Sequence, residues 1–82
     1  MIFAAQAWED YLFWQGTDPK ITRRIHELIK DTMRHPFEGV GKPEPLRHAL
    51  AGYWSRRITD EHRMVYKPAG GDLLLAQLRY HY

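Results

Sequence analysis

The sequence contains no cysteine, no apolar run long enough to span a membrane, and no pair of histidines at the helical spacing of a zinc site. The absence of cysteine excludes disulfide bonds and thiolate metal ligands, so a hydrophobic core must stabilise the fold. Residues 1–5 lack the basic flank and long apolar stretch of a secretory signal, and we expect a cytoplasmic protein. The histidine spacing predicts no metal site, and we expect no cofactor.

The residues that are present have the composition of a small folded domain. Apolar residues make up 44% and aromatic residues 13% of the 82 residues, as in globular proteins. A chain of this length builds one core, so we expect a single domain over residues 1–82. Residues 1–41 hold five Lys and Arg against six Asp and Glu, and residues 42–82 hold seven against four. The basic second half suits a polyanion or an acidic protein partner, although a solvated surface is the commoner cause of small imbalances.

Apolar periodicity predicts two helices in the first half of the chain. A first amphipathic helix is indicated by Ala7, Trp8, Tyr11, Leu12 and Trp14. A second helix starts with Asp18 as its N-cap and Pro19 at its first position, and it ends at residues 35–36, His-Pro. Between residues 36 and 50 lie three prolines and two glycines, which predict an ordered loop.

The remainder of the chain changes to a period of two and predicts an antiparallel meander. Its three strands are expected at residues 53–58, 63–67 and 73–82, and residues 1–4 could add a further short strand. The fold class is therefore α+β, with two N-terminal helices packed on a mainly antiparallel, twisted sheet.

Alternation along the strands assigns their side chains to two faces of the sheet. The face expected against the helices carries Trp54, Ile58, Met64, Tyr66, Leu74, Ala76, Leu78 and Tyr80. The opposite, polar and cationic face carries Tyr53, Ser55, Arg57, Arg63, Val65, Lys67, Gln77, Arg79 and His81. Arg56 falls on the apolar face, so either its stem snorkels past the helices or a bulge shifts the register there.

The polar face carries the residue types that metal-independent RNA cleavage needs. When a 2′-hydroxyl attacks the phosphodiester, a base takes its proton, a cation stabilises the phosphate, and an acid protonates the leaving 5′-oxygen. His81 can deliver a proton near neutral pH. Arg57 and Arg63, on adjacent strands, can hold a phosphate. Glu44, a carboxylate held between two prolines, can act without being buried in a helix.

Each candidate also has an ordinary structural explanation. A histidine near a C-terminus, such as His81, is usually a surface residue. The two arginines could form salt bridges with Asp60 and Glu61, which would leave little charge for RNA. Glu44 could serve only the fold of its loop. Residue types and spacing alone leave these alternatives open.

Several segments, in this order along the chain, resemble the YoeB/Txe family of bacterial toxins. The segments are ELIKDT at 27–32, PFEG at 36–39, GKPEPL at 41–46, WSRRI at 54–58, EHR at 61–63 and RYHY at 79–82. The resemblance extends over nearly the whole chain. It implies a RelE-like ribonuclease fold and cleavage of messenger RNA in the ribosomal A site.

The resemblance also implies roles for individual residues. Glu44 would be the general base, Arg63 would stabilise the pentacoordinate phosphate, and His81 would be the general acid beside Tyr82. Arg57 would hold the substrate backbone. Lys42 and Arg47 would also bind substrate, although Arg47 stands where a lysine is common in the family.

The partners implied by the resemblance are the bacterial ribosome, messenger RNA and a cognate antitoxin of the YefM/Axe type. The antitoxin would cover the C-terminal residues with an acidic, extended segment, and operator DNA would be contacted only through it. Some members of the family form homodimers. Two alternatives remain at this point: a non-catalytic toxin of the same fold that binds a protein such as gyrase, and a plain RNA-binding module.

Overall fold

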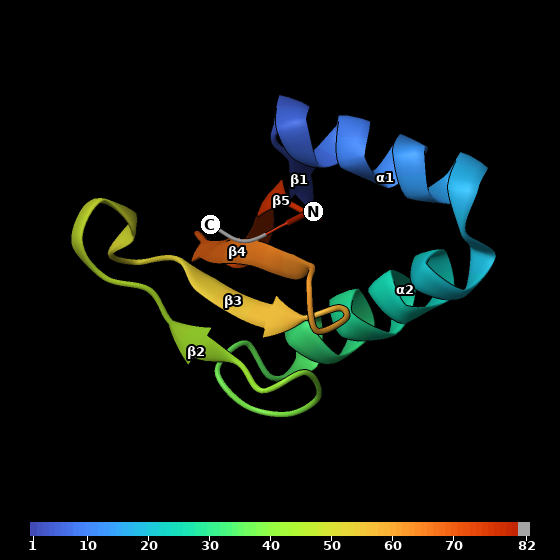
Figure 1. Cartoon of the computed structure of the whole chain (residues 1–82). Coiled ribbons are helices and arrows are strands. Elements are labelled where there is room, and N and C mark those ends of the chain that lie inside the picture. Colours follow the sequence, from blue (N-terminus) through green and yellow to red (C-terminus); the bar gives the residue numbers. More distant parts are fainter. Residues whose placement is uncertain (81–82) are drawn as a thin grey trace.

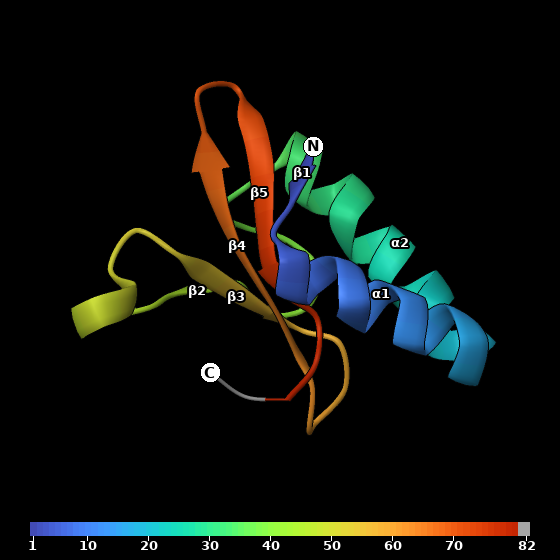
Figure 2. The same cartoon turned by 90° about the horizontal axis from the view of Figure 1, so that it is seen from above.

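Two helices pack against one side of a five-stranded sheet in this computed structural model, which describes residues 1–80 (Figure 1). Helix α1 spans Ala5–Thr17 and helix α2 spans Pro19–Arg34. The strands are β1 Ile2–Phe3, β2 Glu44–Pro45, β3 Trp54–Arg57, β4 Arg63–Ala69 and β5 Asp72–Gln77, with a 3₁₀ turn, η1, at His48–Leu50. The view in Figure 2 shows both helices beside the β1–β5 edge of the sheet. The predicted α+β class is confirmed.

The strand order is β1-β5-β4-β3-β2. Strand β1 runs parallel to β5 and every other pair is antiparallel, so residues 1–4 do supply the further short strand. The prediction of a loop throughout residues 36–50 is wrong at β2, where Glu44 pairs with Ser55 and Pro45 with Trp54. An edge strand tolerates proline because one of its sides needs no N–H donor, and this is why the prolines did not prevent pairing.

The helix boundaries follow local capping. Asp18 Oδ1 accepts hydrogen bonds from the backbone N–H groups of Lys20 (3.0 Å) and Ile21 (3.3 Å), as expected of an N-cap followed by proline. The Asp18 N–H donates to Trp14 O (2.8 Å) and ends α1. One residue therefore terminates the first helix and starts the second. Within residues 1–80, neither helix is long and apolar enough to cross a membrane.

The core lies between the helices and the sheet, and it corrects the predicted faces of the last strand. Ile58, Met64, Tyr66 and Leu78 are buried there as predicted. The assignment of Leu74 and Ala76 to the core is wrong; the buried residues of β5 are Leu73 and Leu75. Tyr66 pairs with Leu75 while Val65 pairs with Gln77, so Ala76 is an extra residue in a bulge. The alternation changes phase at the bulge, and β5 ends at Gln77 rather than at residue 82.

The polar face also differs from the prediction. Ser55 and Val65 are buried, and Tyr80, expected in the core, is 53% exposed. Arg79 stacks on Phe13 of α1, with its guanidinium carbon 3.7 Å from the ring centroid, and so does not join the cationic face. Both alternatives for Arg56 are wrong as well: its register with Met64 is regular, and its side chain is completely buried.

Candidate active site

Three neighbouring strands bring the candidate residues Glu44, Arg57 and Arg63 to one face of the sheet. Glu44 lies opposite Ser55, and Ser55 lies opposite Val65. Arg57 lies opposite Arg63, two positions farther along the same two strands. Because residues two apart on a strand share a face, the carboxylate and both guanidinium groups belong to the same surface. Ordinary strand spacings place the α-carbons of Glu44 and Arg63 roughly 12 Å apart.

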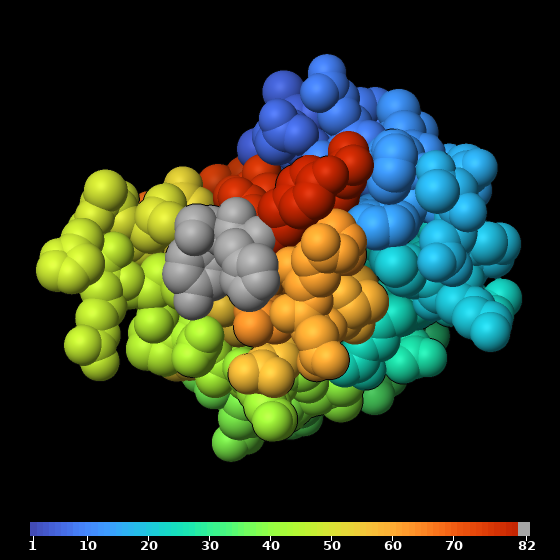
Figure 3. Space-filling view, viewed as in Figure 1, coloured from blue at the N-terminus to red at the C-terminus, as the bar shows by residue number. Residues whose placement is uncertain are grey.

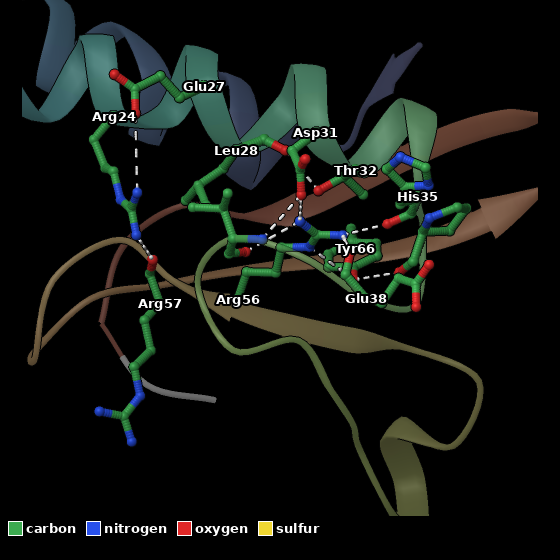
Figure 4. Close-up of polar contacts among 12 residues, drawn as sticks. Arg24, Glu27, Leu28, Asp31, Thr32, His35, Glu38, Arg56, Arg57 and Tyr66 are labelled. Atoms are coloured by element: carbon green, nitrogen blue, oxygen red, sulfur yellow. Dashed lines mark hydrogen bonds and ion pairs between the residues drawn. The ribbon is translucent and has the colours of Figure 1, made fainter.

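Arg57 and Arg63 are register partners on β3 and β4, and no carboxylate of residues 1–80 forms an ion pair with either of them. Arg57 is exposed, and Figure 4 shows its side chain extending away from α2. Arg63 Nη1 donates to Thr59 O (3.3 Å). Within residues 1–80 neither guanidinium forms an ion pair with Asp60 or Glu61; the Glu61 carboxylate lies 3.2 Å from His62 Nε2 instead. Like charges opposite each other destabilise a strand pair, so this surface favours an anion.

The segments around the candidate residues contain strained backbone. Lys42, His48 and Tyr80 are the non-glycine residues with positive φ in the described chain, at 52°, 57° and 60°. Lys42 stands two residues before Glu44, His48 follows Arg47, and Tyr80 is the last described residue. Left-handed backbone is disfavoured for such residues and persists only where the surrounding structure holds it.

Arg47 and Glu44 line the same hollow beside the edge strand. The hollow measures about 660 Å³, and its other walls are Pro45, Leu46 and the η1 residues. Lys42, on the other side of Glu44 in the sequence, is exposed. Of the predicted substrate-binding residues, Arg57 therefore lies on the cationic face and Arg47 beside the carboxylate, while Lys42 lies in the strained loop that leads to it.

A buried arginine holds the loop that carries Lys42 and Glu44. The side chain of Arg56 lies under this loop, and its five N–H groups all have acceptors (Figure 4). The acceptors are the Tyr66 hydroxyl (3.2 Å), the Asp31 carboxylate (2.6 Å) and the backbone carbonyls of His35, Glu38 (2.8 Å) and Val40 (3.0 Å). Residues 35–40 are thereby wrapped around one guanidinium group, which fixes where the loop begins.

Two partners of Arg56, Asp31 and Tyr66, have shifted pKa values with different causes. Hydrogen bonds from Arg56 and then from the Val40 N–H lower the pKa of the Asp31 carboxyl, so it stays ionised. Burial raises the pKa of the Tyr66 hydroxyl, which keeps its proton and donates to Pro36 O (2.6 Å). At Gly39, with φ of 115°, a Cβ would lie 2.2 Å from Asp31 Oδ2, so this turn of the loop requires glycine.

The predicted residues His81 and Tyr82 lie outside the described residues. The segment that leads to them is described as far as Tyr80, whose carbonyl accepts a hydrogen bond from the Arg63 N–H (3.1 Å). The described chain therefore ends beside Arg63. Among residues 1–80 no group of three histidine or carboxylate side chains is arranged to hold a metal ion.

Comparison with known proteins identifies the family. The sequence model for the YoeB-like toxin of bacterial type II toxin-antitoxin systems matches residues 3–82. Toxin YoeB of Escherichia coli (strain K12) is 60% identical over 82 residues, which cover 100% of this chain and 98% of that protein. This chain belongs to the YoeB-like toxins. The resemblance drawn from the sequence is thus confirmed, and the chain is the toxin component of a toxin-antitoxin system.

Solved structures of YoeB proteins share the fold over almost their whole length. A YoeB/ParE toxin from Agrobacterium tumefaciens is 49% identical, with a TM-score of 0.94 over 99% of this chain and 96% of that chain. YoeB of Staphylococcus aureus has been solved in a complex with YefM (44% identity, TM-score 0.93) and as a dimer (45%, 0.92), each covering 99% of this chain and 94% of that chain. The RelE-like fold expected from the family is confirmed.

Sequence reasoning missed Asp31 and Arg56 as residues that hold the loop leading to Glu44. The position of Arg56 on the apolar face was a usable signal, because a charged side chain that is buried needs a hydrogen-bonded partner. Asp31, 25 residues earlier on α2, could not be recognised as that partner without the fold.

Proposed function

We propose that this YoeB-like toxin is a ribosome-dependent endoribonuclease that cleaves messenger RNA in the ribosomal A site without a metal ion. The observation that carries the proposal is the pair of facing arginines, Arg57 and Arg63, on the same face as the Glu44 carboxylate. Two arginines at paired strand positions, neither in an ion pair with a carboxylate of residues 1–80, provide a suitable cradle for a phosphodiester.

The reaction follows from the charges of these groups. The Glu44 carboxylate takes the proton of the 2′-hydroxyl, and the oxygen attacks the adjacent phosphorus atom. Arg63 stabilises the negative charge that builds on the pentacoordinate phosphate. Protonated His81 gives its proton to the 5′-oxygen as the P–O5′ bond breaks. The products are a 2′,3′-cyclic phosphate and a free 5′-hydroxyl, and no cofactor takes part.

Three further predicted residues bind the substrate. Arg57 neutralises a phosphate next to the scissile one, and Lys42 and Arg47 extend the positive surface on either side of Glu44. Tyr82, next to His81 in the sequence, completes the predicted catalytic set, and a tyrosine ring can stack on a base.

The partners follow from the family and from this function. We propose that residues 1–82 act as one domain, in the cytoplasm, on translating ribosomes. A cognate antitoxin of the YefM type neutralises the toxin, as the complex from S. aureus suggests, and self-association is proposed from the S. aureus dimer. Operator DNA is contacted only through the antitoxin.

The proposal is tested by inducing the toxin and its Glu44→Ala and His81→Ala variants in bacteria. The unaltered toxin should arrest growth and cut translated messages, and both variants should lose these effects while circular dichroism shows an intact fold. Removal of a general acid or base lowers such rates by about 10²- to 10⁴-fold. A fully active His81→Ala toxin would refute the assignment. Intact messages together with DNA damage would favour a gyrase-binding toxin instead.

A further inference from the structure

The last described residues lack regular secondary structure but are held firmly in place. Figure 3 shows them in red between helix α1, in blue, and the orange turn that joins β3 to β4. The Leu78 N–H donates to Asp10 Oδ2 (2.9 Å), and Leu78 O accepts from Trp14 Nε1 (2.9 Å). Asp10 is only 3% exposed and also accepts from Gln6 Nε2 (2.9 Å). Helix α1 therefore fixes the start of the segment.

Tyr80 is held from the other side, by the turn. Its N–H donates to Nδ1 of His62 (2.8 Å), and its carbonyl accepts from the Arg63 N–H (3.1 Å). Its φ of 60° is left-handed, a conformation that costs free energy for any residue with a side chain. The hydrogen bonds to His62 in the turn and to Arg63 at the start of β4 supply the stabilisation that this conformation needs.

His62 is itself rigid. Its N–H donates to Thr59 Oγ1 (3.0 Å), and its carbonyl accepts from the N–H groups of Ile58 (2.9 Å) and Thr59 (3.2 Å). Its imidazole ring packs edge-on against Trp14, with ring centroids 4.8 Å apart, and is nearly buried. The turn thus holds the backbone of His62 and the core holds its ring, so the acceptor of the Tyr80 N–H has a fixed position.

The hydrogen bonds also assign the tautomer of His62. Nδ1 accepts the Tyr80 N–H, so it carries no hydrogen. Nε2 then carries the ring hydrogen and lies 3.2 Å from Glu61 Oε1, which accepts it. A histidine in this state links the Glu61 carboxylate to the backbone of the C-terminal segment.

We propose that His62 is a positioning residue: by accepting the Tyr80 N–H it sets the direction in which the chain continues to His81. Tyr80 adds little to the core, because the residue is 53% exposed. The hydrogen bond to its backbone therefore orients the chain more than it packs the core. The inference rests on the proposed function, since direction affects activity only if His81 acts on RNA.

The test compares two variants of nearly equal shape. Asparagine at position 62 retains an acceptor close to the place of Nδ1, whereas leucine has the same outline and no acceptor. His62→Leu should lower the single-turnover rate of message cleavage on programmed ribosomes by up to about 100-fold, because misplacement by 1 Å can cost that much. His62→Asn should cleave close to the unaltered rate, and both variants should bind ribosomes equally well.

His26 provides the matched control, because it too bonds to a tyrosine (Tyr11 Oη, 2.8 Å) but lies on the exposed surface of α2. His26→Leu should cleave at the unaltered rate. Equal rates for His62→Leu and His62→Asn would overturn the proposal. If His62→Leu does not fold, an ester in place of the Tyr80 amide removes the same hydrogen bond from the other partner, and full activity of that protein would also overturn it.

Amide hydrogen exchange separates this inference from the proposed function. The Tyr80 N–H should exchange slowly in the unaltered toxin and in His62→Asn, and fast in His62→Leu. Should the unaltered toxin cut no RNA, the proposed function fails, and the exchange rates still decide whether His62 holds Tyr80. Exchange of the Tyr80 N–H that is insensitive to His62→Leu would refute the positioning role whatever the activity.

Discussion

Replacing Arg56 with methionine should destabilise the fold severely, although arginine is rarely a core residue. Methionine fills similar space but donates no hydrogen bond, so the carbonyls of His35, Glu38 and Val40 lose the guanidinium donor. The Asp31 carboxylate loses its ion pair and keeps the hydrogen bond from the Val40 N–H. Removing one member of a buried, hydrogen-bonded ion pair costs about 3–5 kcal/mol. The lower end applies here, because the Asp31 side chain is 25% exposed and regains some hydration.

A loss of about 3 kcal/mol is a large part of the stability of a chain of this size, which is of the order of 4–12 kcal/mol. The corresponding fall in Tm is at least about 12 °C. Urea unfolding followed by circular dichroism measures the free energy directly. Arg57→Met is the control, because Arg57 is the next residue in the sequence and is exposed. This replacement should change the free energy of unfolding by no more than about 0.5 kcal/mol.

The same experiment can show that the unpaired groups cause the loss. The double variant Arg56→Met with Asp31→Leu removes both charges and should recover part of the stability lost by Arg56→Met alone. An Arg56→Met protein within about 1 kcal/mol of the unaltered one would refute the reasoning, because it would mean that the loop does not depend on this guanidinium group.

Three further predictions concern pH, catalysis and binding. The fold lowers the pKa of Asp31. The contribution of its ionised carboxylate to the free energy of unfolding is therefore complete above the unfolded pKa of about 4 and is lost as the pH falls through the folded pKa. Asp31→Asn should flatten this acid dependence, measured by urea unfolding. Glu44→Gln should lower single-turnover cleavage by about 10²- to 10⁴-fold without changing the Tm. Arg57→Ala should weaken binding to single-stranded RNA. In a plot of the logarithm of the binding constant against the logarithm of the salt concentration, measured by fluorescence anisotropy, the slope should become shallower by about 0.7.

Local signals in the sequence predicted much of the fold. Asp18 followed by Pro19 marks the boundary between the helices, because this pair both caps one helix and cannot continue the other. The alternation of Met64 and Tyr66 predicted the core face of β4. These features depend on residues that are neighbours along the chain, and local physical rules are enough to predict them.

The features that the sequence did not reveal depend on contacts between distant segments. The bulge at Ala76 shifts the phase of β5 without any glycine or proline to signal it. The pairing of Glu44 with Ser55 follows from strand packing and not from the composition of the loop. The bond between His62 and Tyr80 joins residues 18 positions apart, so a turn histidine could not be recognised as part of the site.

Cleavage of a ribosome-bound message with a single 2′-deoxynucleotide tests the central claim most directly. The 2′-hydroxyl next to the bond in the A site is the nucleophile of the proposed reaction, so its removal should abolish cleavage of that bond, while the all-ribose message yields a 2′,3′-cyclic phosphate. Unchanged cleavage of the deoxy-substituted message would contradict the account, because the attacking oxygen would then have to come from elsewhere.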